Sequence, residues 1–166
     1  MLMTSFEPEP TSPDQNPPDE NPPDKSSQPD GAMDLSCPEE PPRILMAEDN
    51  PINQRVGKLI LQRAGFSIDL VGNGLEAKDA HQARSYDVIL MDCQMPTMDG
   101  FEASRQIRAL DQPQPVIIAV TANALAGERE KCLRAGMDDY LSKPFQAEQL
   151  VSVVKKWLAS RAAQRL

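Results

Sequence analysis

Short apolar runs alternate with longer amphipathic segments along the chain from residue 44 onward. The apolar runs predict strands, and the segments between them, where apolar residues recur every three or four positions, predict helices. The predicted strands cover 44–47, 67–71, 88–91, 116–120 and 139–142. The predicted helices cover 50–65, 74–84, 99–110 and 124–136, and a last helix carries Leu150, Val153, Val154, Trp157 and Leu158 on one face.

This strict alternation indicates the fold class. Strands without inside/outside alternation of polarity are buried on both faces, as parallel strands beneath helices are. Right-handed crossovers then place helices on both sides of the sheet. We therefore expect an α/β fold with a doubly wound, five-stranded parallel sheet.

The first predicted helix has recognisable ends. Asn50 is a good N-cap, Pro51 suits the first turn, and Gly65 can stop the helix. Its apolar residues fall at helical spacing, at Ile52, Val56, Leu59 and Ile60. The helix prediction for 50–65 therefore depends on caps and periodicity together.

Charge divides the 166-residue chain into two parts. Residues 1–42 hold 11 prolines, ten acidic residues and one basic residue, and include the repeat NPPDE–NPPDK. Such a segment buries too little apolar surface to offset its ordering entropy, so we expect a disordered acidic tail or linker. Its function is open between a tether, an acidic ligand and a plain solvated leader. Residues 43–166 are nearly neutral and carry no basic patch, which disfavours nucleic acid as a partner.

The cysteines and the N-terminus indicate the compartment. Cys37, Cys93 and Cys132 are widely spaced and odd in number, so we expect reduced thiols rather than disulfides or a metal site. The first residues have neither a basic nor a long apolar region of a signal peptide, and no apolar run is long enough to span a membrane. The sequence predicts a cytoplasmic protein.

Polar residues that directly follow the predicted strands indicate a site. The carboxyl ends of parallel strands share one edge of a sheet, where ligands bind. Five side chains should converge there: Glu48, Asp49, Asp92, Thr121 and Lys143. Crowded carboxylates favour a cation, and oxygen ligands suit Mg²⁺. A lysine and a hydroxyl could hold the remaining oxygens of a phosphoryl group, so this set indicates phosphoryl chemistry at an aspartate. The lone histidine, His81, is expected to be a solvated helix residue with no part in that chemistry.

Four stretches resemble the receiver domain of two-component response regulators, and their sequences are most similar to those of receivers of hybrid sensor histidine kinases. They are ILMAEDNPINQ, VILMDCQMPTMDGFEASRQIR, VIIAVTANAL and CLRAGMDDYLSKPF. The resemblance covers about residues 43 to 160. It implies a flavodoxin-like (βα)5 receiver fold over 43–166, with strand order 2-1-3-4-5.

The resemblance also implies the role of each site residue. Asp92 would be the phospho-acceptor, attacking the phosphorus of a phosphohistidine. Mg²⁺ would be bound by Asp92, directly by Asp49, through water by Glu48, and by the backbone carbonyl of Gln94.

Other residues would complete the switch. Thr121 would move toward the phosphoryl oxygens, and Lys143 would pair with one of them. Tyr140 matches the aromatic residue that turns inward, although it could be an ordinary half-buried strand residue. Pro144 suggests a cis peptide after Lys143.

Several neighbours of the acceptor have smaller expected roles. Pro96, Asp99 and Gly100 would shape the following loop and cap the next helix. Met91 is expected in the core, with Met95 and Met98 in a flexible loop. Cys93 is expected to have no redox role. Gln94 and Asn123 would affect the lifetime of the phosphoryl group. The residue types alone do not show whether they lengthen or shorten it.

The function implied is a phosphorylation-controlled signalling switch rather than an enzyme. It would accept a phosphoryl group from a histidine kinase or histidine phosphotransfer protein and alter the face formed by the fourth helix, fifth strand and fifth helix. We expect a monomer that contacts a downstream protein, either as a single-domain regulator or as the receiver of a hybrid kinase. Two alternatives stay open: an aspartate-based phosphatase, disfavoured by Gln94 where such enzymes carry a second acid, and a pseudo-receiver that only binds.

Overall fold

The computed structural model describes residues 40–122 and 126–164. The ten elements are β1 (Ile44–Ala47), α1 (Pro51–Arg63), β2 (Ile68–Val71), α2 (Gly74–Ala83), β3 (Val88–Asp92), α3 (Gly100–Arg108), β4 (Val116–Thr121), α4 (Ala126–Arg134), β5 (Asp139–Ser142) and α5 (Ala147–Gln164). Strands and helices alternate as predicted, and the boundaries agree to within a few residues. The predicted tail, residue Cys37 and residue Asn123 lie outside the described residues.

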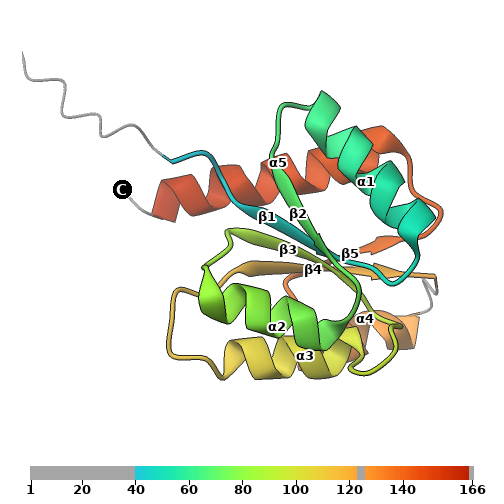
Figure 1. Ribbon diagram of the computed structural model, residues 1–166, viewed down its shortest axis with the longest axis vertical. Coiled ribbons are helices and arrows are strands. Elements are labelled where there is room, and N and C mark those ends of the chain that lie inside the picture. The colour runs from blue at the N-terminus through green and yellow to red at the C-terminus, as the bar shows by residue number, and fades with distance from the viewer. Residues whose placement is uncertain (1–39, 123–125, 165–166) are drawn as a thin grey trace, which may run out of the picture. The chain divides into compact units, whose positions relative to one another are not determined.

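The five strands form one parallel sheet in the order β2-β1-β3-β4-β5, which confirms the predicted fold class. Helices α1 and α5 cover one face of the sheet, and α2, α3 and α4 cover the other (Figure 1). Adjacent strand residues enter opposite cores: Leu45 and Ile89 face α2 and α3, while Ile44 and Leu90 face α1 and α5. Burial on both faces is the physical reason for the unbroken apolar runs.

The helix ends follow the predicted chemistry. The Asn50 side chain accepts a hydrogen bond from Ile52 N at 2.9 Å, and Asp99 accepts one from Glu102 N at 2.8 Å. Both bonds satisfy amide groups that have no partner within the first helical turn. Gly65 follows α1 with a φ of 89°, a left-handed conformation that glycine adopts without steric cost.

The apolar stripe that predicts α1 is not its buried face. Ile52 is 71% exposed, and Val56 and Leu59 are each 48% exposed. Leu61 and Gly57 are buried instead, with Ile60 packed against the core. The helix is therefore confirmed, but three of its four stripe residues face outward.

The expectation that His81 is solvated is wrong. His81 is fully buried, at 0% exposure, where the end of α2 meets the segment between α3 and β4. Its Nδ1 atom accepts a hydrogen bond from Tyr86 N at 3.2 Å. Its Nε2 atom is buried and makes no hydrogen bond with any described residue. A histidine on a polar helix is thus a core residue, because the segment between α3 and β4 covers the end of α2.

The methionines of the β3–α3 segment also depart from expectation. Met91 is buried in the core as predicted, but Met95 is buried with it and Met98 packs against the same cluster. Between them, Thr97 has a φ of 70°, and Met98 N donates to Pro96 O at 2.8 Å across it. This loop is a tight turn anchored by apolar side chains rather than a loose one.

Candidate phosphoryl site at the carboxyl edge of the sheet

The five predicted site residues come together at the carboxyl-terminal edge of the sheet. Asp92 pairs with Val120 in the β3–β4 register, and Thr121 pairs with Ser142 in the β4–β5 register. Lys143 N donates to Thr121 O at 2.7 Å directly beyond that pair. The parallel register therefore places strand ends from distant parts of the sequence side by side.

Three carboxylates form the acidic part of the site. Glu48, Asp49 and Asp92 each offer an oxygen, and these oxygens lie within 4.8 Å of one another. Glu48 and Asp92 are buried, whereas Asp49 is exposed. Buried and exposed carboxylate oxygens at this spacing fit a hard divalent cation that keeps some of its water, as Mg²⁺ does.

Lys143 pairs with both buried carboxylates. Its Nζ lies 2.6 Å from Oε2 of Glu48 and 2.6 Å from Oδ2 of Asp92. Burial raises the pKa of Asp92, and the hydrogen bonds from Lys143 and Gln94 N only partly oppose this rise. Burial also disfavours the charged form of Lys143, but the bonds to Asp92 and Glu48 outweigh it and raise the pKa of that ammonium. The lysine thus stays charged between two acids.

The remaining contacts fix the orientation of the carboxylates. Gln94 N donates to Oδ1 of Asp92 at 2.9 Å. Asn53 Nδ2 donates to Oε1 of Glu48 at 2.9 Å, and Gln54 Nε2 donates to the Glu48 carbonyl at 2.6 Å. Asn53 and Gln54 were missed from the sequence; the signal available was that amide side chains occupy the first turn of a helix that starts at the site edge.

Thr121 and Tyr140 lie on adjacent strands near this edge. Thr121 is buried at the end of β4. Tyr140 pairs with Ala119 in the register and is 39% exposed. The ring of Tyr140 therefore has an outward position in this structure. The Lys143–Pro144 peptide bond is cis, as predicted.

A shallow groove adjoins the site on the α1 side. It is lined by Asn53, Val56, Lys143, Pro144 and Phe145. Val56 belongs to the exposed stripe of α1, hereafter the α1 stripe: Ile52, Val56 and Leu59. The apolar groove thus extends from Lys143 onto the exposed face of α1.

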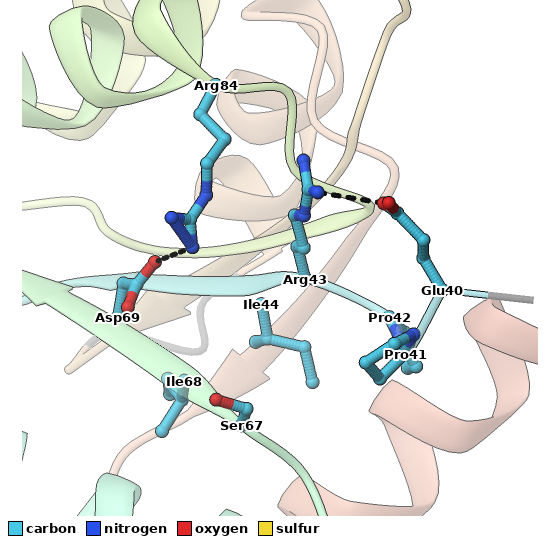
Figure 2. Close-up of a pocket in the computed structure, with 9 residues that line it drawn as sticks. All are labelled: Glu40, Pro41, Pro42, Arg43, Ile44, Ser67, Ile68, Asp69 and Arg84. Carbon is cyan, nitrogen blue, oxygen red and sulfur yellow. Dashed lines mark hydrogen bonds and ion pairs between the residues drawn. The ribbon is translucent and has the colours of Figure 1, made fainter.

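A different hollow lies at the opposite, amino-terminal edge of the sheet, where β1 and β2 begin. Figure 2 shows its two arginines turned toward acids of the same chain: Arg43 bonds Glu40 at 2.8 Å, and Arg84 bonds Asp69 at 3.3 Å. These guanidinium groups are already paired, and the hollow is remote from the carboxylates. The edge that holds Asp92 is therefore the better candidate site.

Comparisons with known proteins agree with the geometry. The family model for the response regulator receiver domain matches residues 44–155. Hybrid signal transduction histidine kinase K of Dictyostelium discoideum is 38% identical over 133 residues, which are 75% of this chain and 11% of that protein. Sensor protein GacS of Pseudomonas syringae pv. syringae is 42% identical over 120 residues, covering 70% of this chain and 13% of that protein. The chain thus corresponds to a small part of these relatives.

Two solved structures are similar over their whole fold. The receiver domain of sensor histidine kinase PA1611 from Pseudomonas aeruginosa PAO1, with a magnesium ion coordinated in its active site cleft, is 45% identical, with a TM-score of 0.68, covering 72% of this chain and 99% of that one. The second is the receiver domain of the Saccharomyces cerevisiae response regulator Ssk1, in complex with the histidine phosphotransfer protein Ypd1. It is 31% identical, with a TM-score of 0.67, covering 70% of this chain and 88% of that one. Among the described residues, no helix has the length and apolar character needed to cross a bilayer.

Proposed function

This chain belongs to the response regulator receiver domain family of two-component and phosphorelay signalling, and we propose that Asp92 is the residue at which it receives a phosphoryl group. Members of this family are signalling switches rather than catalytic enzymes. The single observation that carries the proposal is the position of Asp92, a buried carboxylate held by Lys143 and Gln94 N beside two further acids.

The proposed reaction transfers a phosphoryl group from a histidine nitrogen to a carboxylate oxygen. A carboxylate oxygen of Asp92 attacks the phosphorus of a phosphohistidine, the P–N bond breaks, and the imidazole leaves. Lys143 then exchanges its bond to Asp92 for one to a phosphoryl oxygen, and Thr121 offers its hydroxyl to another. Such transfer depends on positioning and charge neutralisation, which these residues supply.

The acidic set fits Mg²⁺, the ion that the PA1611 receiver coordinates. Asp49, Asp92, Glu48 through water and the carbonyl of Gln94 would hold it. When bound, the ion neutralises charge on the phosphoryl oxygens. The orienting bonds from Asn53 and Gln54 keep Glu48 in place for this role.

The signal would leave the site through Thr121 and Tyr140. Movement of Thr121 toward the phosphoryl group frees space at the end of β4, and the ring of Tyr140 turns inward to fill it. This shifts the equilibrium between two arrangements of the α4-β5-α5 face, where a downstream protein would bind.

The partner that donates the phosphoryl group would be a histidine phosphotransfer protein or a histidine kinase, as in the Ypd1 complex of the Ssk1 receiver. The α1 stripe and the groove beside Lys143 form an exposed apolar surface that reaches the acceptor. A surface of this kind would position a donor helix so that its phosphohistidine faces Asp92.

Incubation with Mg²⁺ and a small-molecule phosphodonor tests the acceptor. We expect a mass gain of one phosphoryl group that Asp92→Asn abolishes. Asp99→Asn is the matched control, because Asp99 caps α3 in the same loop and asparagine also caps helices. Uptake by the Asp92→Asn variant would contradict the proposal. Rapid turnover of the donor would contradict it in favour of a phosphatase, and absence of Mg²⁺-dependent uptake would contradict it in favour of a pseudo-receiver.

A further inference from the structure

The groove beside the acceptor is lined by the two side chains that hold the carboxylate of Glu48. Asn53 Nδ2 donates to Oε1 of Glu48 at 2.9 Å, and Lys143 Nζ donates to Oε2 at 2.6 Å. Both Asn53 and Lys143 line the groove, on the same side as Val56 of the α1 stripe. A molecule in the groove would therefore touch the groups that orient one of the proposed metal-site carboxylates.

Lys143 is the charged group of this set that has contact with solvent to lose. Its side chain is 20% exposed, whereas the side chains of Glu48 and Asp92 are 1% and 8% exposed. A cover over the groove would thus remove water from the ammonium and change little around the two carboxylates. An ammonium deprived of water depends more strongly on its anionic partners, because a buried charge without a partner is costly.

The same ammonium is bonded to oxygens that a metal ion would use. Glu48 and Asp92 both contribute to the acidic cluster, and Lys143 bonds each of them at 2.6 Å. When these carboxylates turn to a cation, the ammonium needs water as its new partner. The open groove supplies that water, and a helix docked in the groove would exclude it. Metal binding beneath a docked helix would therefore leave the charge of Lys143 without a partner.

We propose that Lys143 makes the groove and the metal site antagonistic: a docked helix that carries no phosphoryl group weakens Mg²⁺ binding, and Mg²⁺ weakens docking by the same factor. The occupant is the donor helix of a histidine phosphotransfer protein, so this inference rests on the proposed function. A phosphoryl group on the donor removes the conflict, because its oxygens give the ammonium a new anionic partner. The metal-loaded chain would thus bind a phosphorylated donor in preference to an unphosphorylated one.

A side chain that fills the groove tests the antagonism without a donor protein. Val56→Trp places a large apolar ring in the groove beside Lys143, and titration calorimetry should show a Mg²⁺ affinity several-fold lower than that of the unmodified chain. Leu59→Trp is the matched control, because Leu59 is also 48% exposed on the α1 stripe but is not a groove-lining residue. Its Mg²⁺ affinity should be unchanged. Equal Mg²⁺ affinities of the two tryptophan variants would overturn the proposal.

A double-mutant comparison tests whether the effect passes through the lysine. In the Lys143→Ala background, Val56→Trp should no longer lower the Mg²⁺ affinity. A decrease of the same size with and without Lys143 would overturn the proposal, because the ring would then act on the carboxylates by another route. Absence of Mg²⁺ binding by the unmodified chain is a distinct outcome, which would overturn the proposed metal site and this inference with it.

The reciprocal measurement uses a histidine phosphotransfer protein that passes its phosphoryl group to this chain. Its unphosphorylated form should bind the unmodified chain several-fold more weakly at saturating Mg²⁺ than in a metal chelator. The Lys143→Ala variant should bind it equally well in both conditions. Equal affinities for the unmodified chain with and without Mg²⁺ would overturn the antagonism and leave Asp92 as the proposed acceptor.

Discussion

Nζ of Lys143 lies 2.6 Å from Oδ2 of Asp92, although 51 positions separate the two residues in the sequence. The same ammonium lies 2.6 Å from Oε2 of Glu48, so one lysine serves two carboxylates of the proposed metal site. Without a divalent cation, this lysine is the group that keeps two buried negative charges compatible. Metal binding must therefore compete with it for carboxylate oxygens.

Replacing this lysine should strengthen metal binding and weaken phosphorylation. With Lys143→Ala we expect Mg²⁺ to bind about tenfold more tightly, a gain of about 1.4 kcal/mol, because the carboxylates lose their competing cation. Phosphoryl uptake at saturating Mg²⁺ should fall, since the phosphoryl oxygens lose their partner. Titration calorimetry and phosphodonor assays measure the two effects. Lys156→Ala is the control, because Lys156 is an exposed lysine that pairs with Asp139 instead. An unchanged or weaker Mg²⁺ affinity in Lys143→Ala would count against this competition.

A charge on the α1 stripe should separate transfer from a protein donor and from a small donor. Val56→Glu places a carboxylate on an exposed position of the apolar groove, which should slow transfer from a histidine phosphotransfer protein at least about tenfold. Uptake from a small-molecule donor should stay unchanged, because Val56 makes none of the contacts described around Asp92.

Leu75→Glu supplies the control for the α1 stripe, since Leu75 is an exposed leucine on α2. Its transfer rates should match those of the unmodified chain with both donors. Equal slowing by the two variants would mean that the α1 stripe is not the docking surface.

The β3–α3 loop should tolerate no side chain at Gly100. A Cβ there would overlap the carbonyl oxygen of Asp92 and lie 2.9 Å from Cγ of Met91. Gly100→Ala should lower the free energy of unfolding by about 3 kcal/mol and impair phosphoryl uptake, because the strand end must shift. Gly127→Ala is the matched control, as a Cβ at Gly127 meets nothing within 4 Å and alanine favours helix. Chemical denaturation measures the free energy of unfolding of both variants. Equal stability of Gly100→Ala and Gly127→Ala would contradict the prediction.

His81 should make the stability of the domain depend on pH. Burial lowers the pKa of His81 from its ordinary value of 6.5, and the charges of Arg108 and Arg161 lower it further. The unfolded chain therefore takes up a proton more readily than the folded chain. The stability contributed by neutral His81 is complete above pH 6.5 and is lost as the pH falls toward the lower folded pKa.

The variant His81→Asn isolates this effect. Asparagine keeps an acceptor for Tyr86 N but does not titrate, so the drop in unfolding free energy between pH 7.5 and pH 5.5 should become smaller. Urea denaturation at the two pH values provides the measurement. If the unmodified chain and the variant lose the same stability on acidification, other groups control the pH dependence.

Burial could be predicted for the strands but only in part for the helices. The runs at 88–91 and 116–120 are apolar at every position, so either face of the strand requires a core. An apolar stripe on a helix does not identify the buried face in the same way, because in α1 the stripe residue Val56 is exposed and Leu61 is buried. His81 shows the converse, since a polar residue on a mostly polar helix is buried where the segment between α3 and β4 meets the end of α2.

The order of the elements, the parallel sheet and the edge at which Glu48, Asp49, Asp92, Thr121 and Lys143 meet could all be predicted from the sequence. These follow from local periodicity, helix caps and the rule that parallel strands end on one side. The three-dimensional packing was needed to show which stripe of α1 is exposed and that His81 is buried. Those outcomes depend on how the helices pack on the two faces of the sheet. The local sequence pattern does not reveal that packing, because it brings together residues that are far apart in the chain.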